Sequence, residues 1–141
     1  MQYRDTSGFL SQIYTKTFFL DSIAPSTPQI ITPSDALEYS SGNITLSWNP
    51  TTDTGAGLSP TPYTYLVSVG SGFTSTIVSG STSSTGVLLG LSDGVYYAKL
   101  QVRDLAGNMS TSSVISFRVR KMIDTAANLD SIVSTGSVVF S

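Results

Sequence analysis

The fold class follows from one stretch, residues 91–108, which read LSDGVYYAKLQVRDLAGN. Turn residues stand at both ends of it, and between them Tyr96, Ala98, Leu100 and Val102 alternate with the residues of a second face. A period of two residues is typical of a strand with one buried and one solvent-facing side. We therefore predict a long antiparallel strand here, with Tyr96 in the core.

Six further strands are predicted from the same alternation and from the Pro, Gly and Asn residues that interrupt it. They span residues 30–31, 44–48, 63–69, 73–78, 87–89 and 113–120. A long loop from Pro50 to Pro62 precedes the predicted strand at 63–69. In the strand at 87–89, Leu88 or its two neighbours fit the inward face equally well, so the register stays open. The predicted fold class is all-β, a seven-strand antiparallel β-sandwich without helices, with Trp48 buried between the sheets.

The composition agrees with this fold class and argues against two kinds of partner, nucleic acid and membrane. Only 11% of the 141 residues are charged, the formal net charge is −2, and Ser, Thr and Gly are abundant, as suits short strands joined by turns. No Lys or Arg occurs between Lys16 and Lys99, so nucleic acid is not expected as a partner. No run approaches the ~18 apolar residues of a membrane helix, so membrane insertion is not expected. The N-terminus lacks the layout of a secretion signal, so if the parent protein is secreted, its signal is expected to lie outside this chain.

An internal match suggests that the chain is cut from an array of repeats. Residues 3–20 match residues 102–119 without a gap, at a constant offset of 99 positions, the difference between Arg103 and Arg4. The match predicts these parts: 1–20, the last hairpin of a preceding repeat; 21–28, a stiff linker; 29–120, a complete domain; 121–127, a second linker; 128–141, the first strands of a following repeat. Phe9 stands where the complete copy has Asn108, so we expect the first turn to be built differently.

Four features of the chain resemble the bacterial immunoglobulin-like and fibronectin type III-like repeats of large surface proteins. They are Trp48, the entry Leu91-x-Asp-Gly-x-Tyr96, the exit Asp104-x-Ala-Gly-Asn108 and the linker Asp21-x-x-Ala24-Pro25-x-x-Pro28. The resemblance implies a secreted or cell-surface protein in which this module is a structural spacer or serves adhesion. Its partners would be neighbouring repeats and protein or glycan ligands. The resemblance also makes Tyr96 the tyrosine of a corner motif, whose hydroxyl binds backbone upstream of its strand.

Candidate chemistry is sparse. The chain has no His and no Cys, so neither a Ser-His-Asp or Cys-His nucleophile nor an imidazole or thiolate zinc site can form within it. Asp35, Glu38, Asp53 and Asp93 fall in predicted turns or strand ends, where a pair of acids could serve a glycosidase, but scattered loop acids are usually solvated. We assign no catalytic, cofactor-binding or metal-binding residue, and we expect no enzyme activity and no cofactor.

The segment Asp104-x-x-x-Asn108 has two interpretations. The first is an Asx-type turn, in which the Asp104 carboxylate accepts loop amides and Gly107 adopts a positive φ. The second is a calcium site that Asp21 would join from the linker. Calcium takes 6–8 oxygen ligands, and a single acid from the linker is few for that shell. The turn is the expected structure, and calcium stays open as an alternative.

Two surface features allow functions other than a spacer. Tyr97, together with Tyr63 and Tyr65, could form a platform that stacks a sugar ring, as in a carbohydrate-binding module of a secreted hydrolase. Otherwise these rings cover the sheet or a neighbouring module. The incomplete ends could instead pair with other chains by strand addition, which would make the protein a self-assembling filament subunit. The cations at Arg103, Arg118, Arg120 and Lys121 are expected to guard an edge of the sheet.

Overall fold

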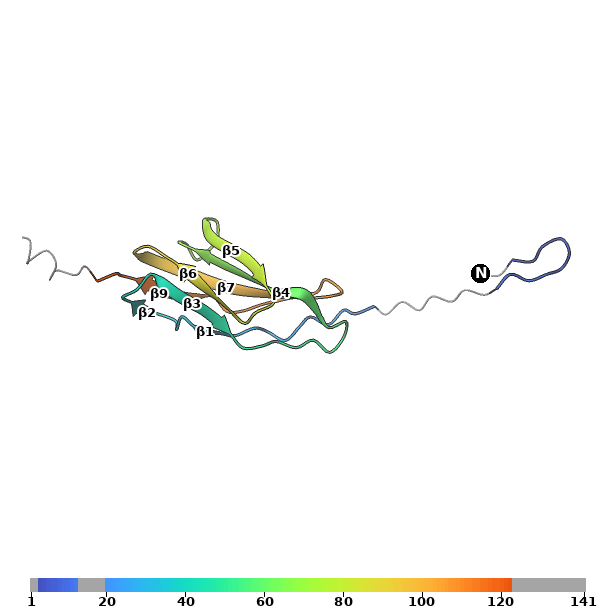
Figure 1. Ribbon diagram of the computed structural model, residues 1–141, viewed down its shortest axis with the longest axis horizontal. Coiled ribbons are helices and arrows are strands. Elements are labelled where there is room, and N and C mark those ends of the chain that lie inside the picture. Colours follow the sequence, from blue (N-terminus) through green and yellow to red (C-terminus); the bar gives the residue numbers. More distant parts are fainter. Residues whose placement is uncertain (1–2, 13–19, 123–141) are drawn as a thin grey trace, which may run out of the picture.

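The computed structural model describes residues 3–12 and 20–122, and in this part of the chain it is all-β, with nine strands and no helix (Figure 1). One sheet has the order β1-β3-β6, and the second has the order β2-β9-β7-β4-β5, with β8 also paired to β7. The strands are β1 (Ile30–Thr32), β2 (Leu37–Tyr39), β3 (Asn43–Trp48), β4 (Leu58–Ser68), β5 (Thr76–Thr82), β6 (Gly86–Gly90), β7 (Gly94–Asp104), β8 (Met109–Thr111) and β9 (Ile115–Val119). Two sheets that share one core are consistent with a β-sandwich.

The central strand β7 has the predicted alternation. Tyr96, Ala98, Leu100 and Val102 are buried, and the residues between them are more exposed. The strand pairs antiparallel with β4 on one side and with β8 and β9 on the other, so every part of its length has a neighbour on at least one side. The hydroxyl of Tyr96 donates to the Ser92 carbonyl at 2.8 Å, which confirms the backbone bond expected upstream of this strand.

The core lies between the sheets and contains both predicted aromatic residues. Trp48, 2% exposed, comes from β3, and its ring centroid lies 5.4 Å from that of Tyr63 on β4. Leu89 on β6 is buried and Leu88 is 72% exposed, so the inward register of this strand is that of Val87 and Leu89. The rest of the fully or nearly buried apolar cluster comprises Ile44, Leu46, Val67, Leu91, Tyr96, Ala98, Leu100, Val102, Phe117 and Val119.

Nine strands are present where seven were predicted, and not all pairs are antiparallel. The short strand β2 was missed, and it runs parallel to β9, from Leu37 opposite Phe117 to Tyr39 opposite Val119. The strand β8 was missed as well, and the predicted strand 113–120 corresponds to β9. Between them, Ser112 keeps contact with β7, because its hydroxyl accepts the Leu100 amide at 2.9 Å.

Two strand boundaries were also wrong. β4 begins at Leu58, inside the predicted loop, because a register shift between Leu58 and Tyr63 accommodates two prolines in the strand. β5 begins at Thr76 rather than at Phe73, which has a positive φ of 55° and lies in the turn before the strand. The Lys99 ammonium lies 4.2 Å above the Phe73 ring, so this aromatic residue covers the outer face of β7.

The first turn of the chain resembles the turn after β7 and shares some of its hydrogen bonds. The Asp5 carboxylate accepts the amides of Ser7 and Phe9 at 2.9 Å each, and the Asp5 amide donates to the Phe9 carbonyl at 3.0 Å. Gly8 has a φ of 87°. The Gly8 amide, however, donates to the Asp5 carbonyl at 3.1 Å, whereas the Gly107 amide of the later turn donates to the Asp104 carboxylate. The two turns therefore differ in the bond of this glycine, in agreement with the expectation, and Phe9 lacks the side-chain contacts of Asn108. The remainder of the predicted hairpin at 13–19 and the predicted segments from residue 123 onward lie outside the described residues.

Candidate functional site at the linker end of the domain

Three carboxylates converge where the linker meets the domain. One oxygen each from Asp21, Asp53 and Asp104 lies within 4.8 Å of the others. Asp21 begins the linker, Asp53 lies in the loop between β3 and β4, and Asp104 ends β7. The alternative weighed from the sequence joined Asp21 to Asp104, and it left out Asp53, which was placed among the solvated loop acids. The signal for Asp53 was the pair of glycines that follow at 55 and 57, since this pattern favours a turn closed by the carboxylate.

Asp104 forms the predicted Asx-type turn. Its side chain is buried, 1% exposed, and its Oδ1 accepts the amides of Gly107 at 2.6 Å and Asn108 at 2.8 Å, while Gly107 has a φ of 99°. Burial raises the pKa of this carboxyl, but hydrogen bonds from the side chain and amide of Asn108 and from the amides of Gly107 and Ala106 outweigh burial and hold the pKa below its ordinary value. Asp104 is therefore anionic at neutral pH.

Asp53 closes its own loop with only one of its oxygens. Oδ2 accepts the amides of Gly55 at 3.1 Å and Gly57 at 2.7 Å. Oδ1 is buried and has no hydrogen-bond partner among the described residues. A buried carboxylate oxygen without a donor costs free energy, because it has lost water and gained nothing in return.

Asp21 binds the linker to the same loop. Its Oδ1 accepts the Ile23 amide at 2.9 Å, and its Oδ2 accepts the Ala56 amide at 2.6 Å. A Cβ atom at Gly55 would collide with this carboxylate, so a glycine is required there for the loop to approach Asp21. The loop after β3 is thus shaped to receive an acidic linker residue.

The side chain of Asn108 joins the linker to the turn after β7. Its Nδ2 donates to the carbonyls of Asp21 at 3.1 Å and Ile23 at 3.2 Å, and to Asp104 Oδ2 at 2.7 Å. Further along, the Ser110 hydroxyl donates to the Pro25 carbonyl. Two backbone groups of the linker and loop also pair, since the Ser26 amide donates to the Thr52 carbonyl at 2.8 Å. The linker is therefore held along its length by two loops of the domain.

The donor set limits what this cluster can bind. Three carboxylates are hard oxygen ligands, which suit Ca²⁺ or Mg²⁺, and the chain has no imidazole or thiolate for a softer metal. Three carboxylates cover only part of a calcium shell of 6–8 oxygens. The remaining oxygens would have to come from backbone carbonyls or water.

The tyrosine platform does not form. Tyr63 is buried, and its hydroxyl accepts the Thr51 amide at 3.0 Å. Tyr63 and Tyr65 lie opposite Val102 and Leu100 of β7, which are inward residues, whereas Tyr97 belongs to the outer face of the same strand. The three rings therefore lie on opposite faces of the sheet and cannot stack one sugar.

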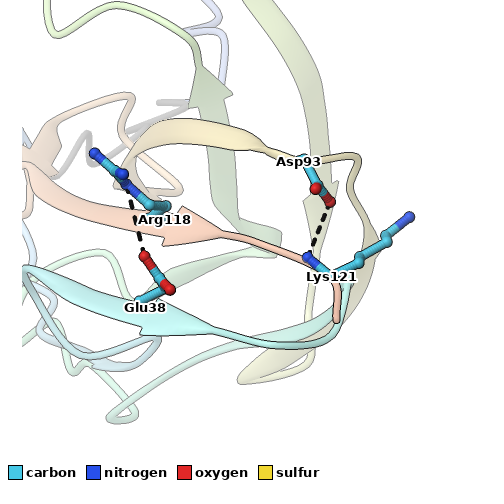
Figure 2. Close-up of polar contacts among 4 residues, drawn as sticks. All are labelled: Glu38, Asp93, Arg118 and Lys121. Carbon is cyan, nitrogen blue, oxygen red and sulfur yellow. Dashed lines mark hydrogen bonds and ion pairs between the residues drawn. The ribbon is translucent and has the colours of Figure 1, made fainter. Parts of the chain in front are cut away.

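The remaining candidate acids are each engaged by a different partner. Figure 2 shows two of these contacts, Glu38 with the Arg118 guanidinium at 3.9 Å and Asp93 accepting the Lys121 amide at 3.0 Å. Asp35 accepts the amide and hydroxyl of Ser116, and these bonds hold the pKa of its carboxyl below the ordinary value.

Two of the four basic residues, Arg103 and Arg118, do not guard an edge as predicted. Arg118 lies on β9, which has β2 on one side and β7 on the other, so β9 is an internal strand of its sheet. Arg103 lies on β7, which is internal as well. The missed strand β2 is the reason, because it covers the side of β9 that the prediction left open.

Comparison with known proteins adds no relative. No family model, no curated protein and no solved structure matches this chain. Among the described residues, none belongs to a helix with the length and apolar character needed to cross a membrane.

Proposed function

We propose that this chain contains an immunoglobulin-like spacer module of a secreted or cell-surface protein with several such repeats, and that it has no catalytic role. The observation that carries the proposal is the path of the chain. Figure 1 shows the linker entering at one end of the domain and the chain leaving past β9 at the opposite end. A module with its entry and exit at opposite ends adds its full length to an array, as a stalk or the shaft of an adhesive protein requires.

The contacts of the linker support a stiff junction. A spacer keeps its ends apart only if the joints between modules resist bending. Here Asn108 binds two linker carbonyls, Asp21 binds the loop at Ala56, and Pro25 and Pro28 are buried against the domain. Prolines reduce the number of conformations that a linker can adopt, and hydrogen bonds at both of its ends reduce that number further.

The immunoglobulin-like assignment is supported by two features. The first is the pair of sheets with Trp48 in the shared core, and the second is the bond from the Tyr96 hydroxyl to the Ser92 carbonyl at the start of β7. Tyr96 and Trp48 come from different sheets, so both sheets contribute the residues on which the resemblance rests.

Backbone relaxation measured by NMR on the full chain tests the stiff junction. The order parameters of the amides at 22–27, excluding proline, are expected to equal those of β7, at about 0.85. Asn108→Ala should lower them at 22–24 and leave β7 unchanged. Asn43→Ala, at an exposed position at the other end of the domain, is the matched control. Order parameters below about 0.6 for the wild-type linker would identify a flexible tether and contradict the proposal.

A second function is favoured by one observation, the buried and unpartnered Oδ1 of Asp53 beside two further carboxylates. We propose that the cluster binds Ca²⁺ and that the ion fastens linker and domain together. A divalent cation would compensate three converging negative charges that no described cation neutralises by an ion pair. It would also connect the three segments that supply Asp21, Asp53 and Asp104.

Thermal unfolding with calcium and with a chelator tests the site. Calcium is expected to raise the Tm of the full chain, because a ligand bound only by the folded state stabilises it. Asp53→Asn should abolish that rise and, in chelator, should leave the Tm unchanged or higher, because it removes repulsion. Asp93→Asn, at the opposite end of β7, is the control and should keep the rise. A wild-type Tm that does not respond to millimolar calcium would mean that hydrogen bonds alone hold the cluster.

A further inference from the structure

The strand β5 leaves one long edge of the larger sheet open. β5 pairs with β4 and with no other described strand, and Figure 1 shows it at the outside of the domain with no strand beyond it. It has seven residues, whereas β2, at the other end of the sheet, has three. Half of its backbone amides and carbonyls therefore point away from β4, toward solvent.

This edge lacks the usual protection against pairing. Proteins commonly guard an exposed edge with charged residues or proline, which oppose the approach of another strand. Residues 54–92 contain no Asp, Glu, Lys or Arg, and β5 contains no proline. One irregularity is present, a register shift at Ile77, but it lies at the start of the strand and leaves 78–82 regular.

The regular part of β5 complements itself. Val78, Gly80 and Thr82 lie opposite inward residues of β4, so Ser79 and Ser81 belong to the outer face. If two copies pair antiparallel about Gly80, Val78 lies opposite Thr82 and Ser79 lies opposite Ser81. Pairs of β-branched residues and pairs of hydroxyls both stabilise antiparallel ladders, and no charge opposes a like charge.

We propose that two copies of this chain associate through antiparallel pairing of β5 with β5 about Gly80. The two larger sheets then form one continuous sheet across a two-fold axis, an arrangement in which each copy uses the same surface. The partner is a second copy of this chain because residues 78–82 complement themselves when two copies pair about Gly80. This contact lies on the side of the domain and is independent of the ends through which repeats follow one another.

Sedimentation of the full chain over a range of concentrations tests the proposal, and a monomer–dimer equilibrium is expected. The double variant Ser79→Lys, Ser81→Lys places like charges opposite each other twice, and it should raise the dimer dissociation constant about fivefold or more. The double variant Ser79→Lys, Ser81→Glu places opposite charges in the same register and should retain the dimer. The control is the double variant Ser83→Lys, Ser84→Lys, which adds the same two positive charges in the turn after β5. Thermal unfolding checks that each variant folds.

The register has a separate test, because the chain has no native cysteine. In a mixture of Ser79→Cys and Ser81→Cys chains, mild oxidation should produce the mixed disulfide faster than either chain pairs with itself. Three outcomes overturn the proposal: a monomer at every concentration up to millimolar, association that the two introduced lysines leave unchanged, or disulfides without preference for the mixed pair. The second of these outcomes would place the contact outside β5.

Discussion

Trp48 is the residue on which the two sheets depend most. Its ring is buried and packs on Tyr63, and its Nε1 has no hydrogen-bond partner among the described residues. We expect Trp48→Ala to lower the free energy of unfolding by about 3 to 5 kcal/mol, because it leaves a large cavity between the sheets. Urea unfolding followed by circular dichroism measures the change.

The matched control for this substitution is Leu88→Ala. Leu88 is the exposed neighbour of the buried Leu89, and its loss should change the unfolding free energy by less than about 0.5 kcal/mol. Equal effects at Trp48 and Leu88 would mean that the side chains facing the core have been assigned to the wrong sides of their strands.

Asp104 gives the domain a sensitivity to acid. Its pKa in the folded state lies below the ordinary value of 3.8, so the carboxylate contributes stability above that pH and loses the contribution as pH falls through the folded pKa. The Tm is therefore expected to fall below about pH 4, and Asp104→Asn should make this fall shallower. Asp35 has a pKa lowered by Ser116 and contributes in the same direction, so Asp35→Asn should flatten the same range and the double variant should flatten it further. A Tm that is independent of pH from 5 to about 3 would contradict both assignments.

At the level of elements, the two Asp-to-Gly turns show how a local pattern fixes a backbone. Gly8 and Gly107 both have a positive φ, and both follow an aspartate by three positions. Gly107→Ala should cost about 1 kcal/mol or more, since an L-residue is strained in this conformation. Gly72→Ala is the control, because the φ of Gly72 lies outside the left-handed region. A Cβ at this position meets no neighbouring atom.

Chemical denaturation of the two glycine variants separates strain from crowding. A Cβ at Gly107 also meets no atom within 4 Å, so any difference between the variants comes from the backbone conformation. If the two substitutions cost the same, the positive φ at Gly107 is not what selects glycine there.

The strands that sequence predicts well are those with a long alternating pattern. β7 was predicted because its alternation runs from Tyr96 to Arg103, and β3 was predicted from Ile44, Leu46 and Trp48. β2 was missed because three residues are too few to show a period, and its pairing with β9 joins positions about 80 apart in the chain. The start of β4 was hidden by Pro60 and Pro62, which read as loop; the register shift before Tyr63 makes them tolerable.

The candidate site was likewise predictable in one part and not in another. The turn at Asp104 was predictable because the carboxylate, Gly107 and Asn108 lie within five consecutive residues. The approach of Asp53 was not, because it depends on where the loop after β3 lies relative to the linker. Local chemistry can be read from neighbouring residues, whereas a cluster drawn from three segments requires the fold.

On the scale of the whole molecule, residues 21–122 hold all nine strands and the buried cluster that the structure describes. This fragment is expected to unfold in one cooperative transition with the Tm of the full chain, because an isolated hairpin such as that of 3–12 is marginal in water. Calorimetry of both chains makes the comparison. A clearly lower Tm for the fragment would mean that residues 1–20 belong to the domain and that the repeat boundary predicted near residue 20 is misplaced.

The parallel pair β2–β9 has a mechanical consequence for a module in a string. In the array that we propose, tension would reach the domain through the linker before β1 and leave it after β9, so it would pull β2 from its first residue and β9 from its last. Parallel strands loaded at opposite ends slide along each other, and every bond between them bears the force at once. These include the bonds from the Ala36 amide to the Ser116 carbonyl and from the Arg120 amide to the Tyr39 carbonyl. The short strand from Leu37 to Tyr39 would thus act, in the proposed array, as a clamp in shear that resists extension of the module.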